Sequence, residues 1–443
     1  MLLRTCGALL LLLGFAGGIS AQTTNIEFTK YKLDNGLTVI LHQDRSTPIV
    51  AVSVMYKVGG KDSFEGRTGF AHFFEHLLFE GSENIERGEF MNYIQNAGGA
   101  FNANTSQDRT YYYEILPSNQ LELGLWLESE RLLHAKVDIK GVETQREVVK
   151  EERRQRVDNQ PYGGWTDQMF SRAFKQHPYK DPNIGYMEDL NSAEEADFKR
   201  FYKMYYVPNN AVLSIAGDFD VAATRKLIEQ YFAPIPKGAE PPRVTTVEPA
   251  LGAEVRDTVY DAKAPLPGVI IGFRTPERNH PDYYAISLMN QVLSSGSSSR
   301  MQKVLIDEKQ VALQAISFPS FTQDPGLSMA LALAKPGNDL TVLEELIDTE
   351  VEKLQDELIS EREFQKIRNQ VEANAISGYG TMAGIAESLA NYEMYQGDAN
   401  LINTEVDRYM AVTREDIRRV AQEYYTKKNR VIVYWLPGEK PSK

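Results

Sequence analysis

Apolar residues recur along this chain of 443 residues with either strand or helix periodicity. Runs rich in branched apolar residues, which favour strands, lie at residues 38–41 and 49–56, and residues 110–116 are also predicted to form a strand. Apolar residues at helical spacing lie at residues 71–79, 121–133, 342–354 and 361–373. Asn35-Gly36 predicts a hairpin turn before the first strand. The elements alternate without regular βαβ spacing, so the pattern predicts an α+β fold of mixed layers.

The two halves of the chain share a pattern that indicates a duplication. In each half a helix runs into a Tyr-Tyr pair, and a turn and an apolar strand follow. The pairs are Tyr205-Tyr206 and Tyr424-Tyr425, and the same offset relates Asn210 to Asn429 in the turns that follow. We therefore expect two tandem, homologous domains, each built from helices and strands.

A cluster rich in proline and glycine separates the two copies. It occupies residues 234–242, lacks apolar periodicity and continues through polar residues to about residue 257. Such a composition is typical of a linker. We expect a first domain at residues 22–238, a linker at 239–257 and a second domain at 258–443.

The first 21 residues have the composition of a secretory signal peptide. A positive charge at Arg4 precedes a short apolar run, and Ala21 is the small residue before the expected cleavage site. The run is too short for a membrane span, and no other apolar stretch of the sequence reaches that length. The one cysteine, Cys6, lies within the signal. We therefore expect an exported protein, periplasmic or secreted, without disulfides or a membrane span.

The chain is acidic, with a formal net charge of −13, and this charge bears on which macromolecules it can bind. Nucleic acids and anionic membranes attract basic surfaces, so the charge argues against both as partners. A solvated acidic exterior is the simplest explanation of the charge balance.

The candidate chemistry lies in the pentapeptide at residues 72–76. His72 and His76 are four residues apart, so in a helix both imidazoles project from one face and can bind one metal ion. Glu75 lies beside them and suits a general base acting on water. The order His-x-x-Glu-His is the inverzincin motif. In an apolar helix, burial of these polar residues without a partner would cost several kcal/mol, which a metal would offset.

A zinc site of this kind needs a third protein ligand and an open position for water. Residues 145–156 read as a helix in which Glu152 shares a side with Val148 and Val149 and points inward. Glu151 is turned about 100° away and is expected to face solvent. From spacing alone, an ordinary exposed charge in a charge-rich helix is the favoured explanation of Glu152.

These segments resemble the pitrilysin family of inverzincin metallopeptidases, which includes insulin-degrading enzymes and mitochondrial processing peptidase. In that family the third zinc ligand is a glutamate about 76 residues after the second histidine, and Glu152 stands at that spacing from His76. The further segments that carry the resemblance are residues 98–105, 206–213 and 217–218. The resemblance implies one zinc per chain, a peptide substrate and hydrolysis assisted by Glu75. It also implies that substrate pairs with an edge strand at Asn102 and Ala103.

The second copy lacks the metal-binding residues. When the segment after His76 is aligned with the segment after Gln291, Ser287, Asn290 and Gln291 stand where the first copy has His72, Glu75 and His76. The resemblance therefore implies two similar domains, of which only the first binds metal.

The chain departs from the family pattern at three positions. Gln145 stands where many members carry a second glutamate. Ile306 and Leu313 stand where active single-chain members carry an arginine and a tyrosine that stabilise the oxyanion, and neither side chain can donate a hydrogen bond. We therefore expect that a second pitrilysin-like subunit supplies these donors in a heterodimer. A homodimer that uses Arg300 or Tyr379 is the alternative.

Two other functions fit parts of the sequence. A non-catalytic family member that retains zinc and serves as a peptide-binding or structural subunit would explain the missing arginine and tyrosine. A purely structural zinc site, however, has no need of Glu75. An unrelated metallohydrolase acting on other substrates is compatible with the motif and is disfavoured only by the family resemblance.

Overall fold

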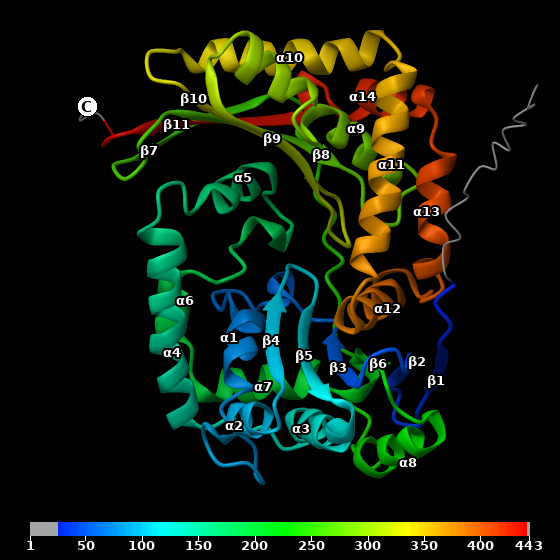
Figure 1. The fold of residues 1–443 in the computed structure, drawn as a ribbon. Helices are drawn as coiled ribbons and strands as arrows, with labels where there is room; N and C mark the ends of the chain where they lie inside the picture. Colours follow the sequence, from blue (N-terminus) through cyan, green and yellow to red (C-terminus); the bar gives the residue numbers. More distant parts are fainter. Residues whose placement is uncertain (1–24, 441–443) are drawn as a thin grey trace, which may run out of the picture.

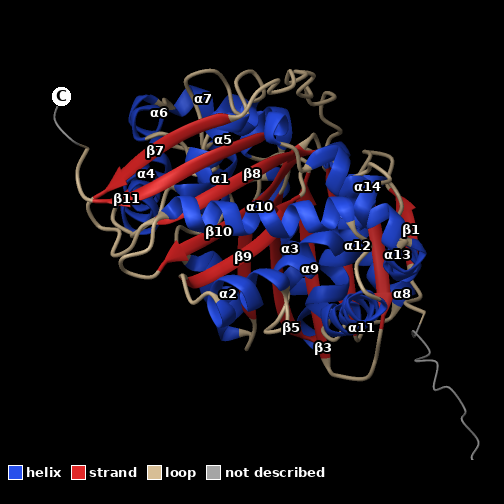
Figure 2. Cartoon of the chain, turned by 90° about the horizontal axis from the view of Figure 1, so that it is seen from above, coloured by secondary structure: helices blue, strands red, loops and turns tan. Residues whose placement is uncertain are grey.

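The computed structural model describes residues 25–440, so the expected signal peptide, with Cys6 and Ala21, lies outside the described residues. Each half of the described chain forms an antiparallel-rich sheet covered by helices (Figure 1). Seen from above, the strands of the second sheet cross over those of the first (Figure 2). Between the halves, no helix or strand lies between Phe232 and Val255. The irregular connection therefore begins before the expected linker at residues 239–257 and ends before it, since a strand begins at Val255.

The first sheet has six strands in the order β1-β2-β6-β3-β5-β4. Their bounds are β1 Thr29–Lys32, β2 Thr38–Gln43, β3 Ile49–Tyr56, β4 Ala100–Thr105, β5 Thr110–Pro117 and β6 Ala211–Gly217. Strands β2 and β6 run parallel, and the other neighbours are antiparallel. The expected hairpin joins β1 to β2, and Gly36 has the positive φ of 94° that such a turn favours. Strand β4 lies at the edge of the sheet.

Eight α-helices belong to the first half of the described chain. They are α1 Phe70–Leu77, α2 Glu89–Asn96, α3 Leu121–Leu133, α4 Ile139–Arg153, α5 Trp165–Ala173, α6 Met187–Ser192, α7 Glu195–Tyr205 and α8 Val221–Phe232. Helix α3 matches its expected bounds, and α1 ends two residues earlier than expected. Helix α4 continues into a π-helical turn at Arg154–Asp158.

The second half repeats this arrangement. Its sheet has the order β7-β11-β8-β10-β9, with β7 Val255–Asp261, β8 Gly268–Thr275, β9 Ala312–Ser320, β10 Gly326–Ala334 and β11 Arg430–Pro437. Its helices are α9 Tyr283–Ser294, α10 Leu340–Asp356, α11 Glu361–Gly378, α12 Met382–Gln396, α13 Leu401–Ala411 and α14 Arg414–Tyr424. Strands β7 and β11 run parallel, as β2 and β6 do. The offset between the two Tyr-Tyr pairs also separates the first residues of α7 and α14, and those of β3 and β8. The predicted α+β duplication is confirmed.

Each half lends one helix to the other half. The second-half helix α12 packs on the first sheet, where Leu389 joins Ile40 and Met55 in one buried cluster. The first-half helix α5 packs on the second sheet, where Met169 joins Val433. Figure 1 shows both helices between the two sheets. Apolar contacts of α5 and α12 therefore hold the two halves together. Each of these helices packs on the sheet of the half to which it does not belong in sequence.

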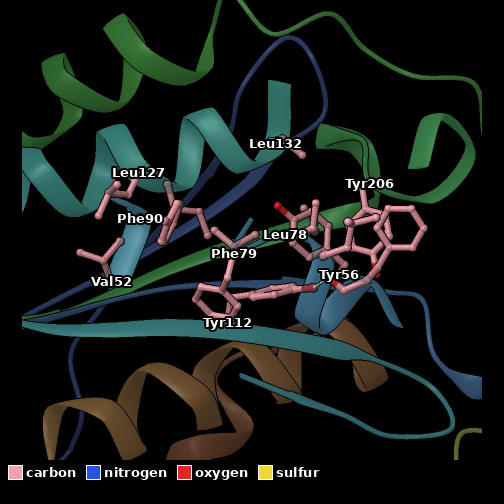
Figure 3. Packing of buried hydrophobic residues seen from close by; sticks show 14 of the residues in the cluster. Val52, Tyr56, Leu78, Phe79, Phe90, Tyr112, Leu127, Leu132 and Tyr206 are labelled. Carbon is pink, nitrogen blue, oxygen red and sulfur yellow. Dashed lines mark hydrogen bonds between the residues drawn. The ribbon is translucent and has the colours of Figure 1, made fainter. Parts of the chain in front are cut away.

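The metal-motif helix α1 rests on an aromatic core in the first half. Phe79, Phe90, Tyr112 and Tyr206 pack between the first sheet and the helices around it (Figure 3). Fully buried Arg131 lies over three of these rings and donates a hydrogen bond to the Leu78 carbonyl at 3.0 Å. Close-packed interiors resist displacement, so this core holds the C-terminal end of α1 in place.

Candidate metal centre

Helix α1 starts where two backbone segments meet closely. Gly69 precedes the helix with a φ of 82°, in the left-handed region that favours glycine. A Cβ atom at Gly69 would lie 2.6 Å from the Ile184 carbonyl oxygen and 2.7 Å from the Gly185 Cα. Only glycine fits this contact, which sets the position from which His72 and His76 project.

His72, His76 and Glu152 converge at one point. The Nε2 atoms of His72 and His76 lie 3.4 Å and 3.0 Å from the Glu152 Oε2 atom. The three ligand atoms lie within 4.8 Å of one another. Four ligands about 2.0–2.2 Å from a tetrahedral zinc ion would lie about 3.3 Å apart. The third ligand candidate, distant from His76 in sequence, is thus brought to the histidines by the packing of α4 against α1.

The unsatisfied carboxylate of this cluster fits a metal ion. The buried Oε2 atom of Glu152, which faces Nε2 of both histidines, has no hydrogen-bond partner among residues 25–440. Burial opposes the charge of Glu152, but the adjacent His72 and His76 outweigh it and hold the pKa of this carboxyl below its ordinary value. A carboxylate and two imidazoles that leave a fourth position open form the ligand set of catalytic zinc sites.

The α4 side chains near Glu152 differ partly from the expectation. Glu151 faces solvent as expected, and Val149 is buried. Val148, however, is 44% exposed, so its predicted place on the inward side is wrong. Glu152 lies near the end of α4. Its other carboxylate oxygen, Oε1, forms an ion pair with Arg156 Nη1 at 2.7 Å. Arg156 lies in the π-helical turn, and a regular helix pattern did not single it out.

Glu75 is held by a residue of the neighbouring sheet. The Thr105 hydroxyl, at the end of β4, donates a hydrogen bond to Glu75 Oε2 at 2.6 Å. Thr105 contacts the site, whereas Tyr112 is fully buried and donates to the Phe74 carbonyl at 2.9 Å.

Asn102 and Ala103 lie on the free edge of the first sheet. Strand β4 pairs with β5 alone, and Asn102 is exposed. The Ala103 backbone N–H donates to the Asn102 side-chain oxygen at 2.9 Å. The side chain of Asn102 thus covers an edge donor that a further strand could use.

Gln145 takes part in a network away from the three ligands. Its amide donates to Glu80, which also pairs with Arg87. Arg87 in turn contacts Asp138, the N-cap of α4, at 3.0 Å. The network braces the loop after α1 against the start of α4, and Gln145 brings no second carboxylate to the site.

The positions of the missing oxyanion donors are apolar in the structure as well. Ile306 packs against the second core, and Leu313 is 52% exposed on β9. The two alternative donors already have partners: Arg300 pairs with Glu363 at 3.0 Å, and the Tyr379 hydroxyl lies 3.1 Å from that of Tyr392.

Comparison with known proteins agrees with this geometry. Residues 38–185 match the family model "Insulinase (Peptidase family M16)", and residues 192–371 match "Peptidase M16 inactive domain". The zinc protease PqqE of Helicobacter pylori is 30% identical over 431 residues, which cover 96% of this chain and 97% of that protein. The chain belongs to peptidase family M16. This is the pitrilysin-like family that the sequence resembles.

Two further relatives extend the comparison. The crystal structure of a protease from Helicobacter pylori superposes with a TM-score of 0.89 at 30% identity, covering 93% of this chain and all of that one. The probable mitochondrial-processing peptidase subunit beta of Schizosaccharomyces pombe is 24% identical over 405 residues, 88% of this chain and 87% of that protein. Within residues 25–440, no helix has the length and apolarity that a membrane crossing requires.

Proposed function

We propose that this chain is an exported zinc metallopeptidase that hydrolyses peptides or small unfolded proteins. The observation that carries the proposal is the convergence of His72, His76 and Glu152 next to Glu75. His72, His76 and Glu152 would hold one zinc ion. When bound, zinc supplies Lewis-acid activation of water and of the substrate carbonyl. Membership of family M16 and the name of the Helicobacter pylori relative support this assignment.

Glu75 performs the proton transfers in this proposal. Its carboxylate accepts a proton from the attacking water and returns it to the leaving amine as the peptide bond breaks. Thr105 donates to one carboxylate oxygen of Glu75 and thereby orients the other. A base must lie within hydrogen-bond reach of the proton it takes, so this orientation bears directly on the rate.

The proposed substrate binds as an added strand. A peptide that pairs with the free edge of β4 would take the Ala103 N–H from the Asn102 side chain. Main-chain pairing is independent of side-chain identity, so this mode fits unfolded segments of varied sequence. The end of β4 carries Thr105, so the paired peptide passes beside Glu75.

We also propose that full activity needs a second subunit. Ile306 and Leu313 supply no hydrogen-bond donor to a developing oxyanion, and loss of one such donor typically costs about 2.7–4 kcal/mol. The relative from Schizosaccharomyces pombe is named as a subunit, which supports a paired arrangement. A pitrilysin-like partner that carries the donors is the first choice, and a homodimer is the second.

The test of the proposed function is Glu75→Gln. The variant is expected to keep one zinc per chain and to lose hydrolysis of an unstructured fluorogenic peptide by about 100-fold or more. Glu151→Gln, on the exposed side of the ligand helix, is the matched control and should behave as wild type. Metal analysis and peptide assays, with and without the paralogous subunit, provide the readouts. Equal hydrolysis by wild type and Glu75→Gln would overturn the assignment.

A non-catalytic, zinc-retaining subunit is the second candidate function. The apolar residues at 306 and 313 favour it, because these two positions supply no oxyanion donor. It predicts zinc binding and peptide binding with no turnover in any pairing of subunits. The same assays therefore discriminate the two functions.

A further inference from the structure

A buried polar joint connects the two halves near the metal centre. It forms where the hairpin between β9 and β10 reaches the first half. Lys61 Nζ lies 2.9 Å from Asp108 Oδ1 and 2.7 Å from Asp324 Oδ2. Lys61 and Asp108 belong to the first half, and Asp324 belongs to the hairpin. The side chains of Lys61 and Asp108 are only 6% and 3% exposed, so this ion pair is well removed from solvent.

Additional hydrogen bonds fix the hairpin tip in this joint. The fully buried Tyr179 hydroxyl donates to Asp108 Oδ1 at 2.6 Å and accepts from the Asp324 N–H at 3.1 Å. The Gln323 N–H donates to Asp108 Oδ2 at 2.9 Å. Burial disfavours a charged Asp324, yet the nearby His177 and Lys61 hold the pKa of its carboxyl below the usual range. The Lys61–Asp108 pair is thus a specific, buried contact, unlike an exposed ion pair, and the 32% exposed side chain of Asp324 joins it from the hairpin.

The same joint holds the loop between β4 and β5. The Gly60 N–H donates to the Ser106 carbonyl at 3.0 Å, and the Lys61 N–H donates to the Gln107 carbonyl at 3.1 Å. The backbones approach so closely that a Cβ atom at Gly59 would lie 2.5 Å from the Gln107 carbonyl carbon. Displacement of Lys61 would therefore move the loop with it.

This loop follows Thr105 directly. The Thr105 carbonyl accepts a hydrogen bond from the Asn183 amide at 2.8 Å, and its hydroxyl donates to Glu75 at 2.6 Å. A continuous set of contacts thus runs from the second-half hairpin, through Lys61 and the loop, to the carboxylate beside the metal ligands.

We propose that the metal-free half positions the base of the metal-binding half, with Asp324 and Thr105 as the positioning residues that hold Glu75. The inference rests on the proposed function, because it assigns a role to the joint in proton transfer. It gives the second half a task that does not depend on oxyanion donors. A base displaced by about 1 Å can lose on the order of 100-fold in rate, so a contact remote from the chemistry can matter.

The first test compares Asp324→Asn with wild type in zinc content, hydrogen exchange and steady-state kinetics. The substitution removes one of the two carboxylates that pair with Lys61, the one contributed by the second half, and keeps the shape of the side chain. Backbone amides at residues 102–109 should exchange about tenfold faster or more, whereas zinc content stays at one per chain. In the zinc-loaded form in which wild type turns over, kcat should fall about 10- to 100-fold with little change in KM. Glu308→Gln, which loses only the exposed pair with Lys303, is the matched control.

The second test asks whether Asp324 acts through Thr105. Thr105→Val removes the hydrogen bond to Glu75, and Thr105→Ser should restore most of the lost kcat. If the inference is correct, Asp324→Asn adds little further loss in a Thr105→Val background. Fully multiplicative losses, no rescue by Thr105→Ser, or wild-type exchange and kcat in Asp324→Asn would each overturn it.

The outcomes separate this inference from the proposed function. If the wild-type chain hydrolyses no peptide with any second subunit, the proposed function is wrong, and so is the role given to the joint. If wild type is active and Glu75→Gln is inactive, normal kcat in Asp324→Asn sinks the inference alone.

Discussion

The two halves place different chemistry at the same point of one fold. In the first half, α1 carries His72, Glu75 and His76. In the second half, α9 carries Ser287, Asn290 and Gln291 at the aligned positions. Glu152 of α4 and Asn374 of α11 stand at the same position when each helix is counted from its N-cap residue.

Asn290, at the position aligned with Glu75, is a neutral side chain held in a closed hydrogen-bond network. Its amide nitrogen donates to the Ile286 carbonyl and to the Tyr425 hydroxyl, both at 2.8 Å. Its oxygen accepts from the hydroxyls of Ser317 at 2.6 Å and Ser328 at 2.8 Å. Every hydrogen-bonding group of the Asn290 side chain is thus satisfied within the protein, which leaves no donor atom for a metal.

The two halves differ in how the polar side chains at the aligned positions of α1 and α9 are satisfied. Within the described chain, the first half retains a buried carboxylate oxygen, Oε2 of Glu152, without a hydrogen-bond partner and next to Nε2 of both histidines. Such atoms are costly unless a ligand satisfies them. At the aligned position, the second half satisfies the Asn290 side chain internally. Gln291 Oε1, at the position aligned with His76, is also buried without a partner in the described chain. The halves therefore differ in the chemistry of these positions, a candidate metal-ligand set in the first and neutral side chains in the second.

The substitution Glu152→Asn tests the difference between the halves most directly. It gives α4 the residue, asparagine, that α11 carries at the matching position, Asn374. Loss of one of three protein ligands should weaken zinc binding by about 1,000-fold or more. Zinc titration and metal analysis of the purified chain provide the measurement. Glu151→Asn, one residue away and exposed, should keep full zinc content. Retention of tight zinc binding by Glu152→Asn would contradict the assigned ligand set.

The substitution Asn290→Ala tests whether the hydrogen-bond network of the second half contributes to stability and not to zinc binding. The variant leaves the buried hydroxyls of Ser317, Ser328 and Tyr425 short of a partner, so the free energy of unfolding should fall by about 3 kcal/mol. Zinc content should stay the same, because the network is closed within the second half. Chemical unfolding followed by fluorescence, together with metal analysis, checks both statements. A loss of zinc with unchanged stability would contradict this division of roles.

Removal of zinc sharpens the comparison further. Zinc that binds only the folded chain stabilises it by about 2.7 kcal/mol at a free concentration of about 100 Kd. Chelation should therefore lower the unfolding temperature, and hydrogen exchange should locate the effect in α1 and α4 and not in α9 and α11. Glu152→Asn is the control, because its unfolding temperature should not respond to the chelator.

Buried carboxylates in the loops before α1 and α9 should respond oppositely to pH. Burial raises the pKa of Asp62 to about 7, whereas hydrogen bonds from Arg419, opposed by burial, lower the pKa of Asp282. The stabilising contribution of protonated Asp62 is complete below the unfolded value of 3.8 and is lost as the pH rises through about 7. That of Asp282 is present above its unfolded pKa and is lost only on acidification.

Asp62→Asn tests this difference with the smallest expected effect. Wild type should lose about 2 kcal/mol of stability between about pH 5 and pH 8 through this group, and the variant should lack that loss. Asp282→Asn should leave the change over the same pH range as in wild type. Denaturant unfolding at both pH values provides the measurement, and equal pH dependence of wild type and Asp62→Asn would contradict the assignment.

The sequence by itself determined the local features of this protein. The spacing of His72 and His76 places both rings on one helical face, because helix geometry is a property of the backbone. The matching surroundings of Tyr206 and Tyr425 indicated the repeated fold, and the strand orders of the two sheets confirm it. For Glu152, spacing alone favoured an exposed surface charge, and only the family resemblance favoured the ligand.

Tertiary structure decided the contacts between distant segments. It brought Glu152 to the histidines, exposed Val148, and joined Thr105 to Glu75. It also packed α5 and α12 each against the sheet of the other half and placed Asp324 against the buried Lys61. Periodicity reports which face of a helix is apolar, but not which partner covers that face. That choice depends on the packing of the whole chain, because side chains far apart in sequence compete for the same buried space.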